Sequence, residues 1–172
     1  MRASEADDAD YIAVVARVLV TGMSGTGKST VLTELRRRGH RAVDTDYDDW
    51  TLPDGTWDER RMDDLIASYT DVVVSGTVEN QSLFYDRFEH VVLISAPLHV
   101  LIERVTSRTT NPYGSTHQHR VEIARYVETV EPLLRRRATL EVDGQRSPSE
   151  LADVIAELIT MRPDPPQVAG VR

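Results

Sequence analysis

The chain has 172 residues, of which 40% are hydrophobic and 28% are charged, and its formal net charge is −8 at pH 7. This size and balance indicate one globular domain with a proper core, and the acidic excess argues against a general nucleic-acid binder. The sequence contains no cysteine, which excludes disulfides, thiol nucleophiles and zinc–thiolate sites, and no apolar run reaches the roughly 18 residues that a membrane span needs.

Residues 1–13 are expected to form a flexible, acidic extension, which is unlike the basic start of a secretion signal and favours a cytoplasmic location. Residues 14–21 predict the first strand because they are apolar nearly throughout, as in a strand covered on both faces. Residues 28–38 predict the first helix, which ends before Gly39. We interpret the three arginines of its last turn as a solvated end that suits the helix dipole.

The segment between this strand and this helix, residues 22–30, reads Gly-Met-Ser-Gly-Thr-Gly-Lys-Ser-Thr and fits the phosphate-binding loop (P-loop). Its glycines let the backbone form a nest of N–H donors at the positive end of the helix. Lys28, the only lysine of the chain, can reach the β- and γ-phosphates, and Ser29 can ligate Mg²⁺. The motif therefore predicts ATP and Mg²⁺ as ligands. The expected nucleotide contacts are Gly22, Ser24, Gly25, Thr26, Gly27, Lys28, Ser29 and Thr30.

A short second strand is predicted over residues 41–43, followed by Asp44 and Asp46. Because these aspartates lie two residues apart, we expect their carboxylates to point the same way. A kinase needs a base for the attacking hydroxyl and a carboxylate that organises the metal. We assign Asp46 to the acceptor hydroxyl and Asp44 to Mg²⁺ through water, with an Asx-turn at the strand end as the alternative.

The following loop has an unusual composition on which the acceptor prediction depends. Residues 44–58 contain six aspartates and no basic residue, interleaved with Tyr47, Trp50 and Trp57. This favours a neutral polyhydroxylated or a cationic acceptor held by carboxylates and aromatic faces. Aspartates that simply face water explain the pattern equally well. The basic residues placed to help bind an acceptor phosphate are Arg60, Arg61 and Arg87.

The rest of the chain alternates between helices and strands, which predicts one parallel sheet with helices on both faces within a single domain, residues 14–161. The polar residues Ser75, Thr77, Glu79 and Asn80 leave the third strand and are expected, together with Gly76, near the acceptor; a helix cap explains them equally well. The predicted elements are a helix over 58–68, a strand over 72–74, a partly helical segment over 79–89, a strand over 91–95, a helix over 98–107, a flexible loop over 109–116, a long helix over 118–137 bent near Pro132, a strand over 138–142, a helix over 148–160 and a disordered tail over 162–172.

Several arginines flank the flexible loop. Arg104 and Arg108 lie four residues apart, so one can cover the adenine while the other reaches the triphosphate. Arg120 and Arg125 follow the loop, and closure of a lid over about 109–120 can bring one of them to the transferred phosphoryl group while excluding water. Solvated helix arginines are the alternative for both pairs.

The order of these features over roughly residues 17–160 resembles the P-loop kinases that include nucleoside monophosphate kinases, shikimate kinase and dephospho-coenzyme A kinase. The resemblance rests on residues 22–30, on the Asp-Thr-Asp at 44–46 and on the Arg104–Arg108 pair. It implies a three-layer α/β fold with a five-stranded parallel sheet, a short lid over ATP and an acceptor site between strands two and three. It also implies that Arg104 stacks on adenine and Arg108 contacts phosphates. Two departures stand out: Ser-Gly-Thr at 75–77 replaces the three glycines of shikimate kinases, and no aspartate ends the third strand as a Walker B residue.

Together these features predict an ATP-dependent kinase, a monomer or homodimer, that phosphorylates a hydroxyl of a small molecule. The expected catalytic residues are Lys28, Asp46, Arg108 and Arg120. The expected acceptor contacts are Asp46, Trp57, Arg61, Gly76 and Thr77. A nucleotide or dephospho-coenzyme A-type kinase is one alternative, and an ATP-binding regulatory protein that transfers nothing is another. A mechanical ATPase of the AAA type is disfavoured because 172 residues leave no room for its helical lid domain.

Overall fold

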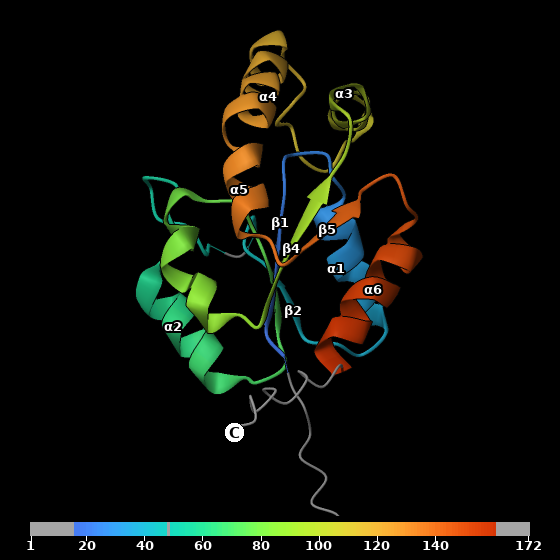
Figure 1. The fold of residues 1–172 in the computed structure, drawn as a ribbon. Coiled ribbons are helices and arrows are strands. Elements are labelled where there is room, and N and C mark those ends of the chain that lie inside the picture. Colours follow the sequence, from blue (N-terminus) through green and yellow to red (C-terminus); the bar gives the residue numbers. More distant parts are fainter. Residues whose placement is uncertain (1–15, 48, 161–172) are drawn as a thin grey trace, which may run out of the picture.

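The computed structural model describes residues 16–47 and 49–160, and its centre is a sheet of five parallel strands in the order β2-β3-β1-β4-β5 (Figure 1). The predicted extension over 1–13 and the predicted tail over 162–172 lie outside the described residues. The strands are β1 (Val18–Thr21), β2 (Ala42–Asp44), β3 (Val73–Ser75), β4 (His90–Ser95) and β5 (Leu140–Asp143).

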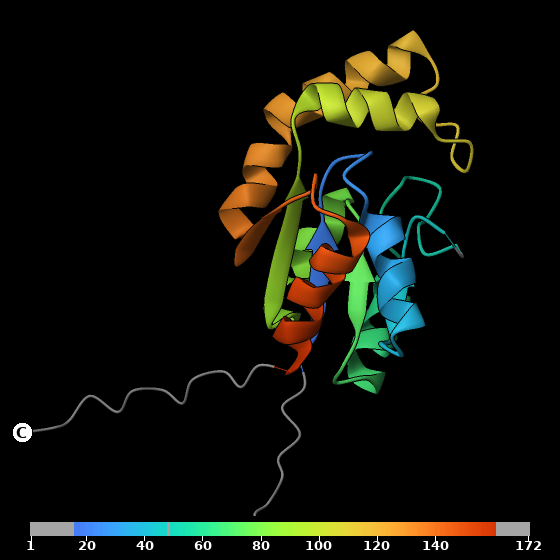
Figure 2. The same ribbon diagram turned by 90° about the vertical axis from the view of Figure 1, so that its right-hand side faces the viewer.

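Helices cover both faces of the sheet, as the alternation of elements predicts (Figures 1 and 2). One face carries α1 (Lys28–Arg37) and α6 (Pro148–Thr160), and the other carries α2 (Glu59–Ser68) and the 3-10 helix η1 (Glu79–Arg87). Successive side chains of a strand point to opposite faces. In β1, Val18 and Val20 therefore pack with the α1 and α6 side and Leu19 packs with the α2 side, and all three are fully buried.

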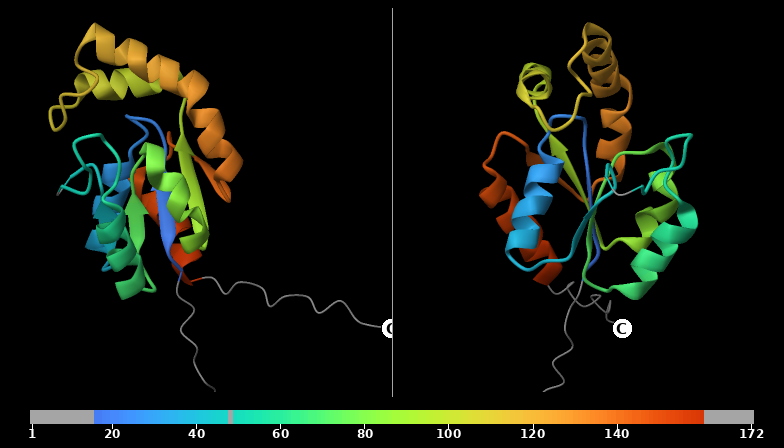
Figure 3. Two further views of the ribbon diagram at one scale, coloured as in Figure 1. Left: turned by 90° about the vertical axis from the view of Figure 1, so that its left-hand side faces the viewer. Right: turned by 180° about the vertical axis from the view of Figure 1, so that it is seen from behind.

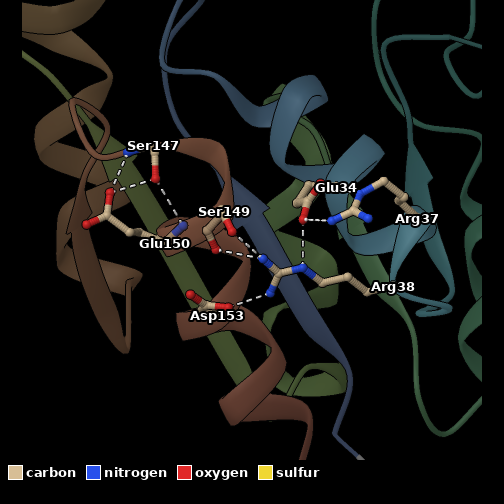
Figure 4. Close-up of polar contacts among 7 residues, drawn as sticks. All are labelled: Glu34, Arg37, Arg38, Ser147, Ser149, Glu150 and Asp153. Carbon is tan, nitrogen blue, oxygen red and sulfur yellow. Dashed lines mark hydrogen bonds and ion pairs between the residues drawn. The ribbon is translucent and has the colours of Figure 1, made fainter.

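Polar contacts join the C-terminal end of α1 to the start of α6 (Figure 4). Arg38 donates from Nε to Glu34 at 2.8 Å, from Nη1 to Asp153 at 2.5 Å and from Nη2 to the Ser149 hydroxyl at 2.7 Å. Arg37, whose side chain is 72% exposed, contacts the same glutamate. The prediction of solvated arginines at the end of this helix therefore holds for Arg37. Arg38 instead connects α1 to α6.

Two of the remaining helices lie beyond the C-terminal ends of the strands, and the third packs beside β4 (Figure 2). In Figures 2 and 3, α3 (Leu98–Ser107) and α4 (His117–Thr129) lie over the β1–α1 loop, and α5 (Glu131–Arg137) leads back to β5. The long helix predicted over 118–137 is two helices, which meet at Val130. Pro132 stands at the start of α5, where its missing N–H is tolerated, and it cannot continue the hydrogen bonds of α4.

In the part of the chain that the structure describes, we find no helix that combines the length and the apolar character needed to cross a bilayer.

Candidate active site

The loop between β1 and α1 forms a nest of free backbone donors. Gly22 has a φ of 147° and Gly27 a φ of 100°, which side chains rarely adopt, and a Cβ on Gly22 would lie 2.2 Å from the Ile94 carbonyl oxygen. Among the described residues, no acceptor bonds to the backbone N–H of Gly27, Lys28 or Ser29. These donors and the N-terminus of α1 suit an anion such as a phosphate.

Lys28 folds back over this loop. Its Nζ donates to the Gly22 carbonyl at 2.7 Å and to the Met23 carbonyl at 3.2 Å, and the residue is 8% exposed. Burial lowers the pKa of Lys28, and the carboxylates of Asp46 and Asp44 act in the opposite direction. A polyphosphate oxygen would pair with this ammonium better than two neutral carbonyls do.

Thr77 also forms hydrogen bonds with Gly22, whose carbonyl accepts from Lys28. Its Oγ1 donates to the Gly22 carbonyl at 2.8 Å and accepts from the Gly22 N–H at 3.2 Å. The Thr21 hydroxyl lies 3.1 Å from it. From the sequence, Thr77 was predicted only to contact the substrate that accepts the phosphoryl group. Its hydrogen bonds to the P-loop are a second role that the sequence did not reveal.

The two aspartates after β2 are placed differently from each other. Asp46 lines the cleft, whereas Asp44 is 4% exposed and its Oδ1 accepts from the Asp46 N–H at 3.2 Å. Partial desolvation by the surrounding cleft raises the pKa of Asp46, although the residue is exposed and the Lys28 ammonium opposes the shift. The Asx-turn considered as an alternative is therefore present, and it presents Asp46 to the cleft.

Two cavities meet at this point. The first, of about 400 Å³, is lined by residues 24–31 of the P-loop and α1, by Arg104 and Arg108 and by Arg146 after β5. The second, of about 420 Å³, is lined by residues that follow β2 and β3, by Asn111 and Tyr113 and by Ile123 and Tyr126 of α4. Both cavities are lined by Ser24, Lys28, Asp46 and Asn111. A group bound in one cavity is therefore next to a group bound in the other.

The structure brings two of the predicted catalytic or nucleotide-binding arginines to the P-loop. Arg108 donates from Nη2 to the Ser24 hydroxyl at 3.1 Å and to the Tyr113 carbonyl at 2.7 Å, and its buried Nε has no hydrogen-bond partner among the described residues. Arg104 donates to the Gly144 carbonyl at 2.9 Å. Arg120 instead donates to the Ser115 carbonyl at 2.9 Å and lines neither cavity.

Three of the predicted acceptor contacts lie away from the two cavities. Trp57 is fully buried, its Nε1 donates to the Thr45 hydroxyl at 2.8 Å, and its ring packs edge-on against Phe84. Gly76 packs against the same ring, and the Arg61 guanidinium lies 4.0 Å from the Trp50 ring centroid. None of Trp57, Gly76 and Arg61 lines either cavity, so the structure does not bring these three residues to the candidate site, and their contact with an acceptor stays a prediction.

Other residues form the walls that the sequence did not identify. Tyr113 and, from α4, Ile123 and Tyr126 line the second cavity, and Arg146 lines the first. The spacing of Ile123 and Tyr126 puts them on one face of α4, which is the signal that could have found them. The sequence does not show which other element this face of α4 lies against.

A sequence profile of the AAA domain family matches residues 18–125, which is more than half of the chain. A shikimate kinase from Acinetobacter baumannii in complex with shikimate has a TM-score of 0.65 at 19% identity, with 86% of this chain and 94% of that chain covered. A shikimate kinase from Bacteroides thetaiotaomicron gives 0.64 at 17% identity, with 86% and 99% covered.

A sugar kinase from Janibacter sp. HTCC2649, in an unliganded structure, gives a TM-score of 0.56 at 16% identity, with 84% of this chain and 94% of that chain covered. No curated protein matches the chain in sequence. At these sequence identities the structural likeness shows the fold alone. It confirms that the fold resembles that of P-loop kinases and that the architecture is the predicted five-stranded α/β one.

Proposed function

Because the chain belongs to the AAA domain family and has the fold of P-loop kinases, we propose that it is an ATP-dependent phosphotransferase that phosphorylates a hydroxyl of a small molecule. The observation that carries the proposal is the meeting of two cavities at Lys28 and Asp46. ATP hydrolysis alone requires one cavity, whereas transfer to an acceptor requires a second one beside the γ-phosphate.

The first cavity fits a polyphosphate. Its free backbone N–H groups, the ammonium of Lys28 and the unpartnered Nε of Arg108 are donors that a polyanion can satisfy. In the proposed complex, Arg104 lies against the adenine and Lys28 and Arg108 bind the β- and γ-phosphates. Ser29, and Asp44 through water, would hold Mg²⁺, which would neutralise charge at the phosphates.

Asp46 is the base of the proposed reaction. A lone pair of the acceptor oxygen attacks the γ-phosphorus, and the hydroxyl proton passes to the Asp46 carboxylate. The bond from the γ-phosphorus to the β–γ bridging oxygen breaks, and its electron pair leaves with ADP. The raised pKa of Asp46 makes its carboxylate a stronger base than that of an ordinary aspartate, which suits a proton acceptor. Lys28 and Arg108 stabilise the charge that develops on the phosphoryl oxygens.

The acceptor is proposed to be neutral or cationic, and to enter between the β2 and β3 ends and the lid. Residues 109–120 are proposed to close over the site as the lid, and Arg120 to reach the transferred group only on closure. The lack of cysteine suits a cytoplasmic enzyme, which we propose acts as a monomer or homodimer.

The test is the release of ADP from ATP and Mg²⁺ in the absence and presence of candidate hydroxyl acceptors. A kinase releases ADP only when an acceptor of the right class is added. Tight binding of ATP without release for any acceptor would instead support the regulatory alternative.

Lys28→Ala provides the residue-level check of the same proposal. We expect kcat to fall at least ~10²-fold, since the loss of one preorganised donor at a transition state has effects of this size. Arg37→Ala, on the exposed side of the same helix, serves as the matched control. Near-normal turnover of Lys28→Ala would refute the role assigned to the ammonium.

A further inference from the structure

The second cavity carries little charge. Among the described lining residues, the charged side chains are Lys28 and Asp46, and both lie at the boundary with the first cavity. The Lys28 ammonium is already bound to P-loop carbonyls. The other polar lining side chains are uncharged: Ser24, Thr51, Thr77, Asn111, Tyr113 and Tyr126.

Three arginines that the sequence offers for the acceptor or the transferred group are engaged elsewhere. Arg87 forms an ion pair with Asp63 at 2.7 Å, Arg120 binds carbonyls of the lid loop, and the Arg125 guanidinium lies 5.2 Å from the Tyr126 ring centroid. None of these arginines lines the second cavity. Lys28 is the one cation among the described lining residues, and the proposed reaction assigns it to the phosphates of ATP. A carboxylate or phosphate on the acceptor would therefore lose its hydration without gaining a cation of its own, which is strongly unfavourable.

The acidic loop offers no better place for an ammonium group. Asp54 Oδ1 accepts from the Thr56 N–H and hydroxyl at 2.9 and 2.7 Å, and Asp58 accepts from the Arg61 N–H and caps α2. Asp46 is the one carboxylate among the described lining residues, and the reaction requires it for the acceptor hydroxyl. An amine in the cavity would compete with that hydroxyl for the same carboxylate.

Two tyrosine rings form the lid side of the cavity. Tyr113 donates to Glu122 at 2.7 Å and Tyr126 donates to the other oxygen of the same carboxylate at 3.3 Å. The Tyr113 ring also packs against His119, with 4.9 Å between the ring centroids. Because Glu122 anchors both hydroxyls and lies outside the lining, the rings offer the cavity aromatic carbon in a fixed position.

We propose that the acceptor is an uncharged polyhydroxylated ring, such as a sugar or a cyclitol, and that Tyr113 and Tyr126 set this specificity. The C–H face of such a ring packs on the tyrosines, and its hydroxyls bond to Thr51, Asn111 and Asp46. This inference rests on the proposed kinase function and narrows its acceptor to one class.

Matched acceptors test the class. With ATP and Mg²⁺, phosphoryl transfer is measured to glucose and myo-inositol, to the carboxylates gluconate and shikimate, to the amine glucosamine and to cytidine monophosphate. We expect uncharged members to react at least ~10-fold faster than any charged member. Transfer confined to charged members would overturn the inference and leave the kinase function standing. Absence of transfer to every member would overturn both.

Lid variants test the two tyrosines with the fastest acceptor of that panel. Tyr113→Ala and Tyr126→Ala are each expected to raise the KM for the acceptor by ~10-fold while the KM for ATP changes far less. Tyr126→Phe, which restores the ring, should recover most of the loss. Val121→Ala, on the exposed face of the same helix, is the control. An unchanged acceptor KM in both alanine variants, with ATP affinity showing that they fold, would overturn the role of the rings.

Discussion

Thr77, two residues after β3, bonds to the P-loop through a hydroxyl, whereas a Walker B residue would offer a carboxylate near this position. Behind Thr77, the Thr21 hydroxyl lies 3.4 Å from Gln81 Nε2, and Gln81 donates to the Tyr85 hydroxyl at 2.7 Å. The Gly22 carbonyl therefore takes one bond from this buried network and one from Lys28. A residue that fixes this carbonyl also fixes where the ammonium rests, which makes Thr77 a positioning residue for the P-loop.

Replacing Thr77 by valine tests this role. The change keeps the shape but leaves the Gly22 N–H without its acceptor, so we expect a loss of about 1–3 kcal/mol of stability and a higher KM for ATP. Thr77→Ser keeps the hydroxyl and should recover most of both losses. Thermal unfolding and the separate KM values for ATP and acceptor are the measurements. An effect on the acceptor KM alone would contradict the positioning role and return Thr77 to acceptor binding.

Asp46 links activity and stability to pH in opposite directions. Since its pKa is raised in the folded protein, kcat/KM should fall about tenfold per pH unit below that pKa, and the fall should begin above the range of an ordinary aspartate. A folded-state pKa above the unfolded one gives stability at low pH that is lost as the pH rises through it. Asp46→Asn should therefore be nearly inactive, yet more stable than the wild type at neutral pH, with the difference vanishing in acid. Equal melting curves at every pH would contradict the raised pKa.

Helices and strands that a local sequence pattern determines could be predicted from the sequence. The position of a side chain that depends on contacts between distant segments could not. The P-loop and its helix are one continuous motif, and the buried strands are apolar runs, so both followed from nearest neighbours. Trp57 looked like a ligand contact because it lies in an acidic loop. The loop folds back through a bridge between Thr51 and Trp57 and a hydrogen bond between Leu52 and Thr56, which buries the ring under β3. That closure depends on where β3 ends, which no local pattern states.

The packing of this loop on the β3 exit can be tested at Gly76. A Cβ there would lie 2.2 Å from Thr45 Oγ1 and 2.9 Å from the Trp57 ring, so we expect Gly76→Ala to destabilise the protein by about 1–3 kcal/mol. Denaturant unfolding measures the loss. In the double variant with Thr45→Ala the nearest atom is gone, and the loss should be smaller than the sum of the two single losses. Additive losses of unfolding free energy would show that residues 76 and 45 are not in steric contact.

At the scale of the whole molecule, charge is separated between the two cavities. The chain has a net charge of −8, yet the first cavity is lined by Lys28, Arg104, Arg108 and Arg146 against one carboxylate, Asp46. Basic side chains of α1, of the end of α3 and of the loop after β5 are thus gathered where a polyanion would bind. The second cavity has no such excess among its described residues.

Because ATP would contact both the sheet side and the lid side, its binding should stabilise the entire fold. A ligand at about 100 times its Kd contributes about 2.7 kcal/mol, which for a chain of this size is a rise in Tm of roughly 5–11 °C. We expect this rise with ATP and Mg²⁺, a smaller one after chelation of the metal, and almost none in Lys28→Ala, whereas Arg37→Ala should behave as the wild type. Differential scanning fluorimetry gives the four values in one experiment. A full rise in Lys28→Ala would mean that ATP binds away from the loop on which the proposed chemistry depends.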